Sequence, residues 1–194
     1  MKKQLLLLVF TLTSLSVFSQ RYIILAGDHK NLKGISQYNV TFDYTNLKVH
    51  GFETEADYIN EKKLKRKGKE GKAEAFEKDW YEARENQYEP AFIAYFNKKF
   101  EKAEIVCSKN SELQYTMNVK TIWIYPGYFS EPAKISAIIT FTETKNPSNV
   151  LFSLEYEKSI GYEDGDFNGR LDNRITGAYE KLAKNITLQL KRLL

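Results

Sequence analysis

Apolar and polar residues alternate along several stretches of this chain, a pattern typical of β-strands with one buried face. The first such stretch runs from Tyr38 to Tyr44. Leu47 and Val49 continue it in the opposite phase, so we expect a bulge or turn at Thr45–Asn46 that returns both side chains to the buried face. Residues 21–37 precede this strand and are expected to form a short linker.

Four further strands are predicted in the second half of the chain, and the first is a short apolar run at Ile105–Cys107. Residues 135–141 and 150–156 alternate in the same way, and Lys145–Asn149 between them has the composition of a hairpin loop. The longest stretch covers residues 113–125, and its in-phase side chains are expected to share one face of the sheet: Leu113, Tyr115, Met117, Val119, Thr121, Trp123 and Tyr125.

Helices are predicted for residues 53–102, where Glu, Lys and Ala predominate and aromatic residues are widely spaced. Gly68 and Gly71 are expected to interrupt this helical region, and Pro90 suits the first turn of a further helix. A final amphipathic helix is predicted at the C-terminus, and its apolar positions recur at helical spacing: Leu171, Ile175, Ala178, Leu182, Ile186 and Leu193.

The order of these elements predicts a single α+β domain over residues 20–194. We expect a mainly antiparallel sheet, helices packed on one face of it, and a long amphipathic C-terminal helix.

The first 19 residues have the organisation of a signal peptide. Two lysines precede an apolar run from Leu5 to Phe18, and Val17 and Ser19 suit the −3 and −1 positions of a cleavage site. The run has about 14 residues and a membrane-spanning helix needs roughly 20, which favours cleavage after Ser19 over a retained anchor. We therefore expect a periplasmic or secreted protein without a transmembrane segment after cleavage.

Composition narrows the class of protein further. The formal net charge of the 194-residue chain is +4, and loss of the signal peptide would bring it close to neutral, which argues against a dedicated nucleic-acid-binding protein. Cys107 is the only cysteine, so no intramolecular disulfide can form, and this favours a bacterial envelope over an extracellular eukaryotic setting. The apolar neighbours of Cys107 predict a buried thiol rather than a reactive one.

Three short segments resemble uncharacterised exported bacterial envelope domains: Tyr125–Tyr128, Pro132–Ile135 and Arg174–Ala183. The overall plan is similar to that of the TolB amino-terminal domain. The resemblance covers about residues 38–194 and depends on layout and short motifs. It implies an envelope-associated module and carries over no catalytic residue.

The segment 164–172 follows the start of a calcium-binding loop, D-x-[DN]-x-[DN]-G. The candidate calcium ligands are oxygen-bearing side chains at loop positions 1, 3, 5 and 9: Asp164, Asp166, Asn168 and Asp172. Position 12 normally holds a bidentate Glu but here is Ile175. A polar turn that caps the following helix is therefore favoured over a calcium site, and no other cofactor is expected.

A basic stretch is one candidate binding surface and contains Lys62, Lys63, Lys65, Arg66 and Lys67. Such a stretch can contact anionic lipid or other phosphate groups. Residues 59–75 include no aromatic side chain for stacking on bases, which argues against single-stranded nucleic acid. The alternative is a solvated helical face or loop without a ligand.

Aromatic residues around Pro126–Gly127 form a second candidate surface. Tyr125, Tyr128 and Phe129 flank this expected loop at a strand end. They can anchor a partner, or they can fold back over the edge of the sheet.

No common enzyme motif is present, neither G-x-S-x-G, H-E-x-x-H, a P-loop nor a dinucleotide fingerprint. The sequence therefore favours an exported, non-enzymatic, envelope-associated binding or assembly module. An envelope protein or a membrane surface is the expected partner, and nucleic acid is not. The alternatives are a weak calcium-binding domain and a hydrolase that uses carboxylates such as Glu155 and Glu157.

Overall fold

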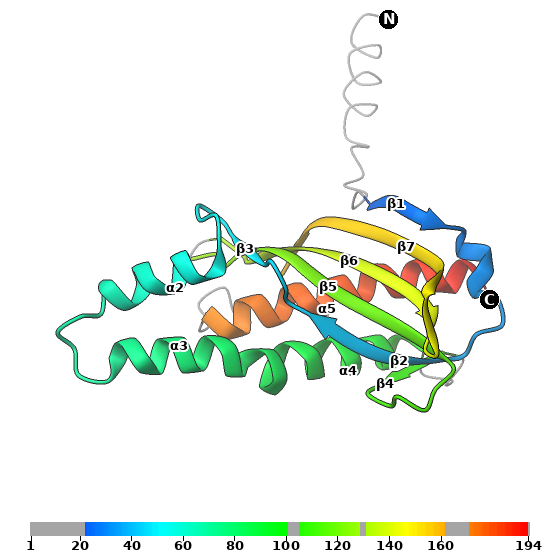
Figure 1. Cartoon of the computed structure of the whole chain (residues 1–194), viewed down its shortest axis with the longest axis horizontal. Helices are drawn as coiled ribbons and strands as arrows, with labels where there is room; N and C mark the ends of the chain where they lie inside the picture. The colour runs from blue at the N-terminus through cyan, green and yellow to red at the C-terminus, as the bar shows by residue number, and fades with distance from the viewer. Residues whose placement is uncertain (1–21, 101–104, 129–130, 162–170, 194) are drawn as a thin grey trace, which may run out of the picture.

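The computed structural model describes residues 22–100, 105–128, 131–161 and 171–193 (Figure 1). The predicted signal peptide and several candidate site residues lie outside these ranges, namely Phe129, Asp164, Asp166 and Asn168.

Seven strands in the described ranges form one mixed sheet in the order β1-β7-β6-β5-β2-β4, and β3 also pairs with β5. The pairs β1–β7, β7–β6 and β6–β5 are antiparallel. Strand β2 runs parallel to both β5 and β4. The strands are β1 (Tyr22–Gly27), β2 (Gln37–Asp43), β3 (Lys48–Val49), β4 (Val106–Ser108), β5 (Tyr115–Tyr125), β6 (Lys134–Glu143) and β7 (Asn146–Ile160).

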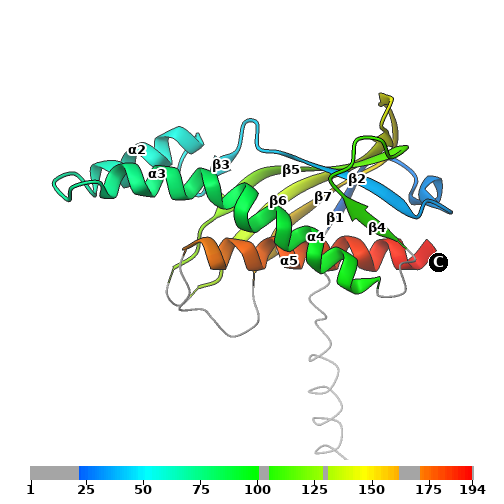
Figure 2. The same ribbon diagram turned by 90° about the horizontal axis from the view of Figure 1, so that it is seen from below.

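Two of the helices cover one face of this sheet, and two others extend beyond it (Figures 1 and 2). Helices α4 and α5 pack against each other beneath the strands. Helices α2 and α3 form an antiparallel hairpin that projects from one end of the sheet. The helical segments are η1 (His29–Leu32), α2 (Glu55–Leu64), α3 (Lys72–Ala83), the π-helical η2 (Arg84–Tyr88), α4 (Glu89–Lys99), α5 (Leu171–Leu190) and η3 (Lys191–Leu193).

The hydrophobic core lies between the sheet and helices α4 and α5. Full burial of each large apolar side chain contributes about 1.5–3 kcal/mol. The residues that fill the core are at most 1% exposed and include Val40, Met117, Ile139, Leu154, Phe92, Phe96, Ile175, Ala178, Leu182 and Ile186. The predicted α+β plan, with helices on one face of a mainly antiparallel sheet and a long C-terminal helix, is confirmed.

Strand β5 differs from its prediction in one important way. Met117, Val119 and Thr121 face the helices as expected, but the register with β6 shifts between Thr121 and Trp123. The extra residue at this bulge changes the phase of the strand, so Ile124 is buried in place of Trp123. Trp123 and Tyr125 therefore lie on the other face of the sheet, which α4 and α5 leave uncovered.

One boundary and one linker were also predicted wrongly. Residues 22–27, within the expected linker, form edge strand β1, whose mostly exposed side chains show no alternation. Asn146 already pairs with Glu143, so β7 begins inside the expected hairpin loop. Pro90 lies in the first turn of α4, as predicted, and η2 joins this helix to α3. The wider turn of η2 accommodates a proline that has no N–H to donate.

Gly161 allows the end of β7 to approach α5 closely. A Cβ atom at this position would lie 2.6 Å from the Ala178 backbone nitrogen and 2.8 Å from the Arg174 carbonyl oxygen. We expect Gly161→Ala to force these segments apart and lower the free energy of unfolding by about 1–3 kcal/mol. Urea denaturation measures this change, and an unaltered midpoint would contradict the close approach.

Candidate functional site

The hairpin of α2 and α3, residues 55–83, is called the helical arm below, and residues 62–72 are its tip. Thr54 begins the arm with a capping box, because its hydroxyl accepts from the Asp57 N–H and the Asp57 carboxylate accepts from the Thr54 N–H. At the far end, Gly68 and Gly71 both adopt positive φ. The predicted interruption of the helix at these glycines is confirmed, and it reverses the chain direction.

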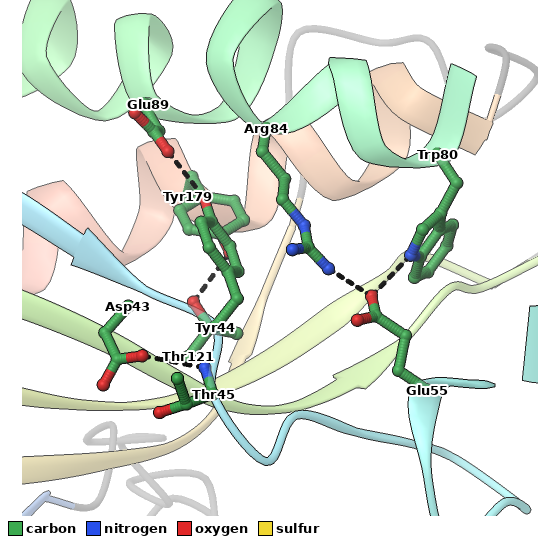
Figure 3. A network of polar contacts seen from close by, with 9 residues as sticks. All are labelled: Asp43, Tyr44, Thr45, Glu55, Trp80, Arg84, Glu89, Thr121 and Tyr179. Carbon is green, nitrogen blue, oxygen red and sulfur yellow. Dashed lines mark hydrogen bonds and ion pairs between the residues drawn. The ribbon is translucent and has the colours of Figure 1, made fainter. Parts of the chain in front are cut away.

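Partly buried polar contacts join α2 to α3 and to η2 at the base of the arm (Figure 3). The Glu55 carboxylate of α2 accepts a 2.6 Å hydrogen bond from the Trp80 indole of α3 and pairs with Arg84. The Glu55 and Arg84 side chains are only 15% and 18% exposed. The Arg84 guanidinium also lies over the Tyr44 ring, 4.3 Å from its centroid, so the same group contacts the end of β2.

The network continues from Tyr44 into the sheet and its covering helices (Figure 3). The Tyr44 hydroxyl donates to Glu89 of α4 at 3.3 Å, and Lys109 forms an ion pair with the same buried carboxylate. The Tyr179 hydroxyl of α5 is 2.7 Å from the Thr121 hydroxyl of β5. Burial raises the pKa of Tyr44 well above its usual range and the pKa of Tyr179 to about 12. Both phenols therefore remain protonated at neutral pH and serve as uncharged hydrogen-bonding groups.

Aromatic packing stabilises the arm along its length. The ring centroid of Tyr58 on α2 lies 4.9 Å from that of Trp80 and 6.1 Å from that of Phe76, both on α3. It also lies 5.4 Å from the ring centroid of Phe52, which precedes the arm in the sequence. These contacts give the arm a small apolar core of its own. Together with the ion pair at the base, they fix the direction in which the arm points.

Four of the five cations named in the predicted basic stretch interact with other side chains of the arm. Lys63 pairs with Glu77 and Lys65 pairs with Glu61. The Arg66 guanidinium lies 4.3 Å from the Phe76 centroid, and the Lys62 ammonium lies 5.1 Å from that of Tyr58. These four cations are therefore engaged within the arm.

Three other lysines of the tip remain open to solvent. Lys67, Lys69 and Lys72 are exposed, and among the described residues none of them forms an ion pair. Leu64 is 67% exposed beside them. A hollow of about 770 Å³ between the helix ends is lined by residues that include Leu64, Lys67 and Lys69. The candidate residues chosen from the sequence include Lys67 but not Leu64, Lys69 or Lys72, although all of these lie within the basic run from Lys62 to Lys72.

Only part of the predicted aromatic surface is free to contact a partner. The Tyr125 hydroxyl donates to Glu131 at 2.7 Å, and Lys134 lies 5.2 Å from its ring centroid, so Tyr125 is held against the end of the sheet. Tyr128 forms a backbone bridge with Glu131, and its side chain is 56% exposed.

Asp172 is the one candidate calcium ligand within the described residues. It accepts a 2.8 Å hydrogen bond from Gln87 of η2 and so connects the start of α5 to the base of the arm. The described part of the chain contains no group of three or more His, Cys, Asp or Glu side chains that could hold a metal ion. The calcium hypothesis stays a prediction, because its other ligands lie outside these ranges.

Cys107 lies in the core, as its apolar neighbours predict. Burial raises the pKa of its thiol to about 12. The thiolate is the nucleophilic form of cysteine, so this side chain is unsuited to nucleophilic chemistry at neutral pH.

Comparisons with protein-family models, with curated proteins and with solved structures found no match. Within the ranges that the structure describes, none of the helices has both the length and the apolar character needed to span a bilayer.

Proposed function

We propose that this protein is an exported, non-enzymatic, envelope-associated binding module that contacts an anionic membrane surface through the tip of the helical arm. The observation that supports this most is the position of the exposed lysines. They lie at the far end of an arm that projects beyond the sheet (Figures 1 and 2). A flat surface can therefore approach the tip without meeting the body of the domain.

The charges of the tip suit a weak, reversible contact. Each lysine close to an anionic bilayer contributes about 1 kcal/mol of attraction, and Lys67, Lys69 and Lys72 are the lysines placed to do so. Insertion of Leu64 adds up to about 1.5–3 kcal/mol if its side chain is fully buried. The attraction is sensitive to salt, because charges in solution are screened over about 8 Å at physiological ionic strength.

Vesicle co-sedimentation tests this function. We expect the protein to bind vesicles that contain phosphatidylglycerol but not vesicles of phosphatidylcholine alone. Replacing Lys67, Lys69 and Lys72 together with Gln should weaken binding by roughly tenfold or more, because three attractive charges of about 1 kcal/mol each are lost. Added salt should weaken binding by the parent protein in the same direction.

A matched triple variant separates a specific site from a general charge effect. Lys30, Lys98 and Lys145 are exposed lysines outside the arm, and their replacement with Gln changes the net charge by the same amount. We expect this control to bind like the parent protein. Equal loss in the two triple variants, or no binding by the parent protein, would contradict the proposal.

A further inference from the structure

A second surface lies on the face of the sheet opposite α4 and α5. It is a groove of about 490 Å³ that crosses strands β3, β5, β6 and β7. The side chains that line it are Asn46, Lys48, Ile122, Trp123, Ser136, Glu155, Glu157 and Lys158. Two of them, Glu155 and Glu157, are the carboxylates of the hydrolase alternative.

Unusual backbone conformations are concentrated at this groove. Among the described residues, Asn46 and Lys158 are the non-glycine residues with positive φ, 60° and 48°, and both line the groove. Positive φ is sterically unfavourable for residues with a Cβ, and such conformations persist where the surrounding structure enforces them. The Lys158 N–H donates to the Ser136 hydroxyl at 3.0 Å, which holds this part of β7 in place.

Two strand irregularities also meet here. The bulge in β5 lies at Ile122, and the register between β6 and β7 shifts between Ile135 and Ala137, at the level of Ser136. Trp123 pairs with Ser136, so the two irregularities are adjacent. Bulges change the direction of side chains and are common beside functional sites. Here the β5 bulge brings Ile122 and Trp123 together in the lining of one groove.

Neighbouring aromatic rings hold Trp123 in position. Its ring centroid lies 6.4 Å from that of Tyr125, with the two planes 16° apart. The His50 ring meets Trp123 edge-on at 5.7 Å and Tyr125 edge-on at 5.1 Å. The Lys158 ammonium also lies over the indole, 5.9 Å from its centroid, so Trp123 is a fixed, partly exposed ring at the edge of a polar groove.

The balance of charge in the groove indicates the chemistry of its ligand. Two lysines and two glutamates line it, so it favours neither a polyanion nor a polycation. Ile122 and Trp123 supply an apolar surface, and Asn46, Ser136 and Glu155 supply hydrogen-bond donors and acceptors around it. A pyranose ring has the complementary form, because its C–H groups form an apolar face and its hydroxyls surround the edge.

We infer that this groove binds a neutral oligosaccharide chain, with one sugar ring stacked on Trp123 and its hydroxyls hydrogen-bonded to the surrounding polar side chains. The surface is separate from the helical arm, so this inference does not depend on membrane binding by the tip.

Titration with cellohexaose, maltohexaose and chitohexaose, followed by NMR of the indole N–H signals, tests the inference. The chain has two tryptophans, and Trp80 is buried in the arm, so only the Trp123 signal should shift. We expect saturable binding of at least one of these sugars. Trp123→Ala should weaken that binding at least tenfold, whereas Tyr81→Ala, which removes an exposed aromatic ring from the arm, should leave it unchanged.

A second variant keeps the test decisive if Trp123→Ala fails to fold. Glu155→Gln preserves the shape of the side chain and should weaken binding severalfold, because a charged acceptor bonds hydroxyls more strongly than an amide does. Absence of a Trp123 shift with all three sugars would overturn the inference. Unchanged affinity in folded Trp123→Ala would overturn it as well.

Discussion

Leu182→Ala is expected to lower the free energy of unfolding by about 2–5 kcal/mol. Leu182 is completely buried on the face of α5 that packs against the sheet. Its truncation removes apolar contacts and leaves a cavity between rigid elements, so both effects reduce stability. Chemical denaturation followed by far-UV circular dichroism measures the change.

Leu188 provides the matched control on the same helix. Its side chain is 52% exposed, so Leu188→Ala removes the same atoms from a position with few contacts. We expect a change within about 0.5 kcal/mol for this variant. Similar losses at Leu182 and Leu188 would mean that α5 does not pack on the sheet as described.

The second large effect is expected at the base of the helical arm. Glu55→Ala should lower the free energy of unfolding by about 2–3 kcal/mol, because the Trp80 N–H and the Arg84 guanidinium both lose a charged acceptor in a mostly buried setting. The helix α2 should also lose protection from amide hydrogen exchange. Exchange followed by mass spectrometry localises that loss to the arm.

Glu53→Ala is the corresponding control. Glu53 pairs with Lys48 at 3.2 Å, but the two side chains are 88% and 59% exposed. Exposed ion pairs contribute about 0–1 kcal/mol, so we expect little change in stability or in exchange within α2. A loss at Glu53 as large as that at Glu55 would show that burial of the Glu55–Arg84 pair is not what fixes the arm.

The parts of the fold that could be predicted are those with strong periodicity. Ile175, Ala178, Leu182 and Ile186 recur at helical spacing, and all four are fully buried in α5. The break in alternation at Thr45–Asn46 correctly indicated a turn, since Asn46 adopts positive φ and Leu47 returns to the core. In these segments the local pattern and the tertiary packing favour the same conformation.

The prediction errors occur where pairing between β-strands decides the structure. Strand β1 pairs with β7 alone at the edge of the sheet, so neither of its faces is buried enough to produce alternation. The bulge at Ile122 moves Trp123 from the expected core face to the open face. Residues 122–125 are all apolar or aromatic, so their sequence does not fix which of them faces the core. A bulge depends on the partner strand, which a single sequence does not specify.

In the candidate site, too, the features set by local sequence could be predicted and those set by tertiary contacts could not. The basic stretch was evident from composition, but its separation into engaged and free cations depends on Glu77, Phe76 and Tyr58, which become neighbours only in the folded arm. The groove around Trp123 was not predicted, because its residues come from four strands and from the turn before β3. The positive φ of Lys158 has no signal in the sequence, since lysine has no preference for that conformation.

The central claim is that the tip of the helical arm contacts an anionic membrane, and a fluorescent label at the tip tests it most directly. Cys107 is buried, so Leu64→Cys introduces a single accessible thiol for an environment-sensitive dye. Lys145→Cys places the same dye on the turn between β6 and β7, at the end of the sheet away from the arm (Figure 2). We predict a blue shift on phosphatidylglycerol vesicles for the label at position 64 and none for the label at position 145. Equal shifts at both positions, or no shift at position 64, would contradict the claim.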